Sequence, residues 1–140
     1  MTALTRDRDT PRLEGDIFEH GVAAATVLFG GSLICFNAAG YLVPGSTATT
    51  LIAAGRCERR VDNSGGAAGD KLGKVRPGNY RFDNSTSTDA ITIAEIGDDC
   101  FIVDDQTVAK TNGTNTRSRA GKVVAVDALG VWVAVGITKS

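Results

Sequence analysis

The C-terminal stretch of the chain constrains the fold most, because it has the pattern of two β-strands joined by a tight turn. Two valine-rich runs, at 123–126 and 131–135, flank Asp-Ala-Leu-Gly at 127–130. Valine favours strands, Asp suits the first position of a type I turn, and Gly supplies the left-handed residue that follows. The sequence therefore predicts a β-hairpin close to the C-terminus.

Residues 31–43 repeat this pattern early in the chain, with Asn-Ala-Ala-Gly at 37–40 in the place of the turn. We therefore expect a second hairpin of the same kind. One stretch favours a helix, because Thr92 and Glu95 have capping-box spacing and Gly97 is a suitable stop. Together these signals predict an all-β fold, an antiparallel β-sandwich or barrel with at most one short helix.

The chain divides into a short N-terminal arm and one folded domain. Its 140 residues and 42% hydrophobic content suit one domain with one core, which we place at residues 17–140. Residues 1–16 contain many charges and only Leu4 and Leu13 as sizeable apolar groups, so this segment cannot order itself by burial. Two interpretations stay open for this arm: a disordered tail, or an extended strand that orders against a neighbouring subunit.

The charges of the arm alternate in sign. If the segment is extended, Arg6 and Arg8 point to one side and Asp7 and Asp9 to the other. Such a strand can pair with an exposed sheet edge on a neighbour while its charges fix the register. These four residues, together with Arg12, are therefore candidate residues for contact with another protein.

The overall charge excludes several classes of partner. Fifteen basic residues nearly balance sixteen acidic residues, which leaves a net charge of −1. The chain therefore lacks the excess of basic residues that nucleic-acid and anionic-membrane binders carry.

No apolar run is long enough for a membrane span or a signal peptide, so we expect a protein made and used without secretion. The three cysteines are widely spaced, which predicts buried free thiols in a reducing compartment.

The sequence contains few residues that could form a catalytic or metal site. His20 is the only histidine, and neither a nucleophile elbow nor a phosphate-binding loop is present, since Asp-Lys-Leu follows Gly69. Four aspartates lie at 98, 99, 104 and 105, but their spacing is not that of a calcium loop. We interpret them as turn residues and predict no enzymatic activity, no cofactor and no metal.

Trp132 is the only tryptophan and lies in the C-terminal hairpin. Alternation along the strand points Val131, Val133 and Val135 to one face and Trp132 and Ala134 to the other. Two interpretations are open. Trp132 either packs in the core or, if a partner covers the second face, anchors an interface.

Three segments, at 61–70, 96–109 and 117–133, together resemble a family of small proteins encoded beside the major capsid protein of tailed bacteriophages. These are the capsid cement, or decoration, proteins. The similarity extends from about residue 12 to the end of the chain. Its motifs consist of turn and strand residues, which identify a fold family better than a mechanism.

The resemblance implies a jelly-roll protein that binds the major capsid protein on the outer surface of the phage head and bridges neighbouring capsomers, after assembly in the bacterial cytoplasm. It implies no catalytic residues. We expect a homo-oligomer, and a dimer rather than a trimer, because two-fold contacts are commonest. The alternatives are another phage structural or host-recognition module, such as a head fibre or a tail-associated carbohydrate binder, and a jelly-roll enzyme. An aromatic content of 6% counts against a carbohydrate binder.

Overall fold

The computed structural model describes residues 2–10 and 15–137, and almost all of its regular secondary structure is β-strand. The strands are β1 (Phe18–Gly21), β2 (Thr26–Leu28), β3 (Leu33–Phe36), β4 (Leu42–Pro44), β5 (Ile52–Cys57), β6 (Val61–Asn63), β7 (Leu72–Arg76), β8 (Gly78–Asn84), β9 (Asp99–Ile102), β10 (Thr107–Ala109), β11 (Arg119–Asp127) and β12 (Gly130–Val135). Two three-residue 3₁₀ turns, η1 (Ser87–Asp89) and η2 (Ile93–Glu95), complete the described elements. The predicted all-β fold is confirmed.

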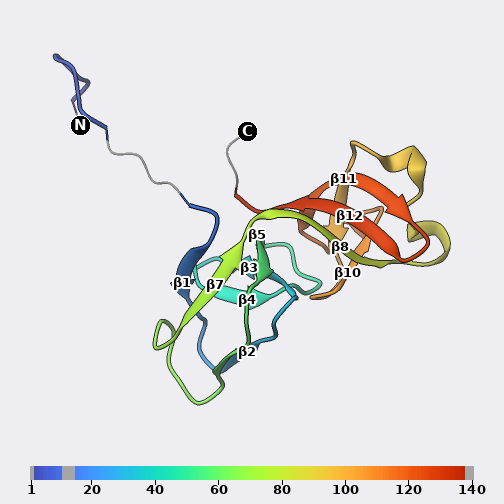
Figure 1. Ribbon diagram of the computed structural model, residues 1–140, viewed down its shortest axis with the longest axis horizontal. Helices are drawn as coiled ribbons and strands as arrows, with labels where there is room; N and C mark the ends of the chain where they lie inside the picture. Colours follow the sequence, from blue (N-terminus) through green and yellow to red (C-terminus); the bar gives the residue numbers. More distant parts are fainter. Residues whose placement is uncertain (1, 11–14, 138–140) are drawn as a thin grey trace.

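The strands form two main units that lie side by side along the molecule (Figure 1). The first is a five-stranded antiparallel sheet of order β1-β7-β5-β3-β4, beside a ribbon of β2 and β6. The second is a closed barrel of order β10-β8-β12-β11-β9, whose closing pair, β10 with β8, is parallel. Closure pairs every barrel strand on both sides, whereas the sheet keeps two edges, β1 and β4.

One strand crosses from the sheet to the barrel, because only Pro77 separates β7 from β8. Proline lacks an N–H and ends the ladder of the first unit. Backbones crowd at this corner: a Cβ on Gly55 would lie 2.6 Å from the Arg76 carbonyl oxygen, and one on Gly136 would lie 2.4 Å from the Ala54 carbonyl oxygen. Side chains larger than hydrogen are therefore excluded at Gly55 and Gly136.

An ionic cluster ties the two units together at the same corner. The Glu58 carboxylate pairs with the guanidinium of Arg56 at 2.7 Å and of Arg76 at 3.2 Å. Arg56 also lies over the ring of Tyr80 in the barrel, 4.4 Å from its centre. The bond from Arg56 is the main reason that the pKa of Glu58 is lowered. Arg56 of β5 and Arg76 of β7 thus serve a structural junction.

The buried residues form two clusters, where the sequence led us to expect one core. Alternation along β3 divides them: Leu33 and Cys35 belong to the barrel cluster, and Ile34 belongs to the cluster between the sheet and the β2–β6 ribbon. All three are fully buried. β3 therefore lies in a middle layer that is covered on both faces.

Both predicted hairpins are present, as β3–β4 and β11–β12. Their turns are closed by the same device. The Asn37 side-chain oxygen accepts hydrogen bonds from the N–H groups of Ala39 and Tyr41, both at 3.0 Å. Asp127 Oδ1 accepts from the N–H groups of Leu129 at 2.8 Å and Gly130 at 3.1 Å.

The predicted helical signal is confirmed as the single turn η2. Thr92 Oγ1 accepts from the Ala94 N–H at 3.2 Å, and the Glu95 carboxylate accepts from the Thr92 N–H at 2.8 Å, which completes the capping box. η1, which the sequence did not reveal, begins at Ser87 with a φ of +57°.

Candidate functional site

Trp132 lies on the outer face of the barrel. Its neighbours Val131, Val133 and Val135 are buried inside the barrel, whereas Trp132 is partly exposed and Ala134 is exposed. The alternation predicted from the sequence is confirmed, and the interpretation of Trp132 as a core residue is wrong. The strand is covered by the barrel core on one face only, so the largest side chain of the protein is left at the surface.

Two charged residues hold the Trp132 indole in place. Its Nε1–H donates to Asp127 Oδ2 at 3.0 Å, and the Arg81 guanidinium lies 5.6 Å from the centre of the ring. The bond from Trp132 is the main reason that the pKa of Asp127 is lowered. Because Asp127 also closes the hairpin turn, the indole is fixed to the backbone of β11 and is preorganised for contact.

The surroundings of Trp132 follow from the strand register. Trp132 pairs with Arg81 on β8 and with Ala125 on β11, and Ala134 pairs with Asn79 and Lys122. We call this surface the β12 face; it comprises Asn79, Arg81, Asp83, Lys122, Ala125, Asp127, Gly130, Trp132 and Ala134. Its central strand is apolar and its two flanking strands carry charges of both signs. That is the composition of a protein-binding surface, with an aromatic centre and a polar rim.

A second exposed aromatic residue, Phe29, was not singled out from the sequence. Its side chain is 55% exposed, and the Arg60 guanidinium lies 5.6 Å from the centre of its ring. The Gly31 N–H donates to the Cys57 carbonyl at 2.8 Å, which joins the two loops that present this pair. In the sequence, only Gly30 and Gly31 indicate a loop at this position, and they do not predict that the phenylalanine is exposed.

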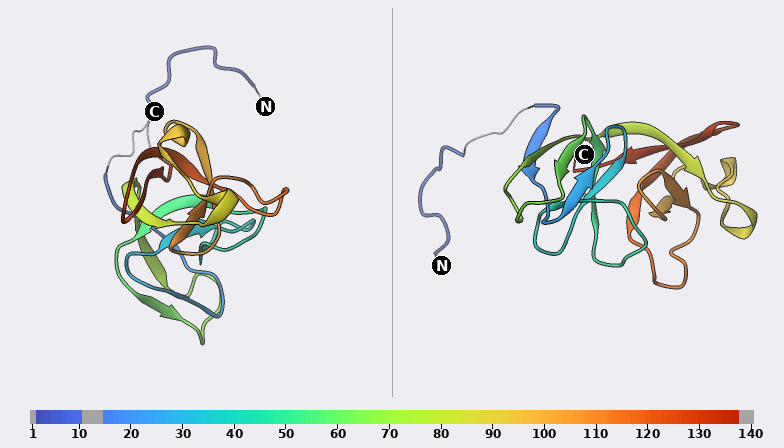
Figure 2. Two further views of the ribbon diagram at one scale, coloured as in Figure 1. Left: turned by 90° about the vertical axis from the view of Figure 1, so that its right-hand side faces the viewer. Right: turned by 90° about the horizontal axis from the view of Figure 1, so that it is seen from below.

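The described residues of the arm, 2–10 and 15–16, are all exposed. Figures 1 and 2 place it beyond β1, at the opposite end of the molecule from the barrel. Its one side-chain hydrogen bond among the described residues is internal, from Arg8 to Thr10 at 2.8 Å. The candidate residues Arg6, Asp7, Arg8 and Asp9 are therefore exposed, while Arg12 lies outside the described residues.

The four aspartates serve different purposes. Asp104 Oδ1 accepts from the Gln106 N–H at 2.9 Å, as predicted for a turn residue. Asp99 begins β9 instead, and its carboxylate pairs with Arg119 at 2.7 Å and Lys122 at 3.2 Å. Within residues 2–10 and 15–137, no group of three histidine, cysteine or acidic side chains is arranged to hold a metal ion.

The predicted buried free thiols are confirmed for Cys35, Cys57 and Cys100. Burial raises the pKa of Cys35 and Cys100 to about 12 and also raises that of Cys57. A buried thiol with a raised pKa is a poor nucleophile. His20 packs edge-on against the Phe36 ring, with 4.9 Å between ring centres. These residues therefore have packing roles.

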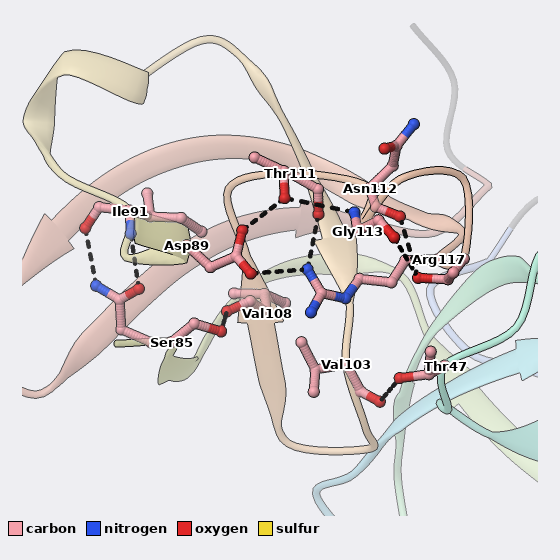
Figure 3. A network of polar contacts seen from close by, with 12 residues as sticks. Thr47, Ser85, Asp89, Ile91, Val103, Val108, Thr111, Asn112, Gly113 and Arg117 are labelled. Carbon is pink, nitrogen blue, oxygen red and sulfur yellow. Dashed lines mark hydrogen bonds and ion pairs between the residues drawn. The ribbon is translucent and has the colours of Figure 1, made fainter. Parts of the chain in front are cut away.

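A polar network fixes one end of the barrel (Figure 3). Arg117 Nη1 donates to Asp89 Oδ2 at 3.2 Å and to the Thr111 carbonyl at 3.0 Å, and Thr111 Oγ1 donates to Asp89 Oδ1 at 2.5 Å. The Thr111 bond is the main reason that the pKa of Asp89 is lowered. The network joins η1 to the loop at 111–117. Its members are distant in sequence, so no local pattern predicts it.

The glycine-rich segment at 64–71 is an ordered surface connection between β6 and β7. Asn63 is 1% exposed, and its Nδ2 donates to the carbonyls of Ala23 at 2.9 Å and Ala67 at 3.0 Å. Asp70 Oδ2 accepts from the Ala67 N–H at 2.9 Å. The polar groups of this segment are therefore used mainly to hold the loop.

No helix in the described part of the chain is long and apolar enough to cross a membrane. Searches against protein-family models, curated proteins and solved structures found no match to this chain.

Proposed function

We propose that this protein is a structural decoration protein of a tailed-phage head. It binds the outer surface of the major capsid protein shell and stabilises the head by bridging neighbouring capsomers. The observation that supports this most is the combination of a β-body with an exposed arm at one end and, on β12 of the barrel, a partly exposed, hydrogen-bonded tryptophan. Two separated contact surfaces are what a protein needs in order to bridge two neighbours.

The arm supplies one of these contacts. An extended segment can pair its backbone with a sheet edge on the shell, and its alternating charges then fix the register. Each exposed ion pair contributes only about 0–1 kcal/mol and weakens with salt. Firm attachment therefore depends on backbone pairing and on many copies acting on one shell.

Deletion of residues 1–16 tests this role. The truncated protein should melt within a few degrees of the intact protein, because the described arm residues are exposed and make little contact with the body. Its occupancy on heads stripped of decoration should fall and become more sensitive to salt. A matched control exchanges the signs of the charges at Arg6, Asp7, Arg8 and Asp9, which keeps length and composition. If the truncated protein decorates such heads as fully as the intact one, the arm has no role in attachment.

One observation favours a second function, a host-recognition module that binds carbohydrate. An exposed indole flanked by Asp127 and Arg81 could stack on a sugar ring while the two charged groups accept and donate hydrogen bonds. Titration of Trp132 fluorescence with a panel of bacterial surface glycans distinguishes the two. A saturable change in emission that is lost in Trp132→Ala supports recognition of carbohydrate, whereas decoration predicts no response.

A further inference from the structure

On the β12 face, side chains of opposite character lie at corresponding positions on the two sides of Trp132. On β12, Ala134 and Gly130 lie two residues to either side of Trp132. On β11 they pair with Lys122 and Asp127 respectively. A positive and a negative side chain thus lie on opposite sides of the Trp132 row, along one flank of the face. Each is opposite a β12 residue two positions from Trp132, and the bulge between Val123 and Ala125 adds one residue on the Lys122 side.

On the other flank of the face, formed by β8, the corresponding pair is a hydrogen-bond donor and a carboxylate. On β8, Asn79 pairs with Ala134 and Arg81 pairs with Trp132, while Asp83 lies two residues beyond Arg81 on the same face. Asn79, Arg81 and Asp83 are all exposed. An amide and a carboxylate therefore also lie at equal strand distances on either side of the Trp132 row.

Such a surface is complementary to its own copy. Consider two copies that meet face to face, related by a two-fold axis that lies in the plane of the interface. If this axis passes through Trp132 and is perpendicular to β12, residues on one side of Trp132 in one copy face residues on the other side of Trp132 in the second copy. Lys122 then faces Asp127 of the second copy, and Asn79 faces Asp83 of the second copy, each contact occurring twice. An axis along β12 instead places Asp83 against Asp127, two like charges, so the charges select the perpendicular axis.

We infer that the β12 face is the interface of a homodimer in which the two Trp132 side chains meet on the two-fold axis. The inference deepens the proposed function by naming the partner of this face as a second copy of the chain. The partly exposed Trp132 and the exposed Ala134 form the apolar centre, with the buried Gly130 on the other side of Trp132, and the charged residues of β8 and β11 form the rim.

The rim charges can make these contacts without leaving their present partners unpaired. Asp99 is shared by Lys122 and Arg119, so Lys122 can turn towards a second copy while Arg119 stays on Asp99. Asp127 uses its two oxygens for the turn and for the indole, and a carboxylate has room for a further donor. The one contact between like charges joins the two Arg81 side chains, each of which lies over the Trp132 ring of its own chain, 5.6 Å from the ring centre.

A residue on a two-fold axis meets its own copy, and this gives a specific test. Trp132→Glu and Trp132→Lys each place two like charges together and should raise the dimer dissociation constant of the full chain at least about tenfold, as measured by sedimentation equilibrium. An equimolar mixture of the two variants should restore association, because Glu then meets Lys. Far-UV circular dichroism and thermal melting check that both variants are folded, which the exposed position of Trp132 favours.

Each other outcome overturns the inference. If the intact protein sediments as a monomer at every concentration used, the face does not pair with its copy. If both variants stay dimeric, the dimer uses another surface. If both are monomeric and the mixture does not associate, Trp132 is not on the axis. The measurement uses no phage heads, so loss of head binding by a protein that still dimerises refutes the proposed function alone.

Discussion

The two hairpins share a sequence pattern and a turn device, yet their surroundings differ. In β3–β4 the consecutive residues Leu33, Ile34 and Cys35 are all fully buried, because the barrel covers one face of β3 and the β2–β6 ribbon covers the other. In β11–β12 only alternate residues are buried, and the other face carries Trp132. A local pattern therefore specifies a hairpin, while the number of layers packed on it decides which residues remain available to a partner.

The largest expected contrast between the hairpins concerns accessibility to a thiol reagent. Cys35 on β3 is fully buried with a pKa raised to about 12, and Ala134 on β12 is exposed. Below the concentration at which the protein associates, a cysteine introduced by Ala134→Cys should therefore react orders of magnitude faster than Cys35 in the native protein at mildly alkaline pH. Mass spectrometry of alkylated peptides measures both sites in one sample, and the denatured protein, in which all cysteines react, is the control. Comparable native rates would show that β3 is not covered on both faces.

Stability gives the next contrast. Ile34→Ala removes a fully buried side chain from the middle layer and should lower the free energy of unfolding by about 2–5 kcal/mol. Trp132→Ala removes a larger side chain, but one that is partly exposed and makes one hydrogen bond to Asp127, so the loss should be about 1 kcal/mol. Urea unfolding of both variants below the concentration of association makes the comparison. A larger loss for Trp132→Ala would mean that the indole supports the core.

The two turns differ in a smaller way, because Asn37 is neutral and Asp127 is charged. The hydrogen bond from Trp132 lowers the pKa of Asp127 in the folded protein, so this carboxylate contributes stability that is present above its unfolded pKa of about 4 and is lost as the pH falls through the lower folded value. The difference in unfolding free energy between the intact protein and Asp127→Asn should therefore shrink below about pH 4. The matched variant Asn37→Ala should differ from the intact protein by an amount that does not change over this range. A pH-independent difference for Asp127→Asn would show that its charge does not matter.

Local patterns predicted the local elements. The β-branched runs, the Asn and Asp turn residues and the Thr92–Glu95 capping box each reported an element that the structure contains. Local patterns did not predict how the elements are arranged in space. The barrel is closed by the parallel pair of β10 with β8, and no local pattern encodes which strands pair. The junction at Arg56, Glu58 and Arg76 likewise depends on the β5–β7 register.

For the candidate surfaces too, the sequence predicted local features and not their arrangement in space. Alternation correctly separated Trp132 from Val131 and Val133, but it could not decide whether the second face would be covered. That depended on where the sheet, the ribbon and the barrel lie relative to one another. The partner of Trp132 on its own chain, Asp127, was visible in the sequence only as a turn residue. Its bond to the indole follows the hairpin register, in which Asp127 pairs with Gly130 and Ala125 pairs with Trp132.

The proposed role on the phage head is tested most directly by a cryo-EM map of the virion, combined with quantitative gel analysis of the chain relative to the major capsid protein. Decoration predicts that the chain is present in copy numbers comparable to the capsid protein, with density for the β-body at repeated positions on the outer surface, where each dimer contacts more than one capsomer. Absence of the chain from purified virions, or its presence in a few copies at the tail only, would contradict the account.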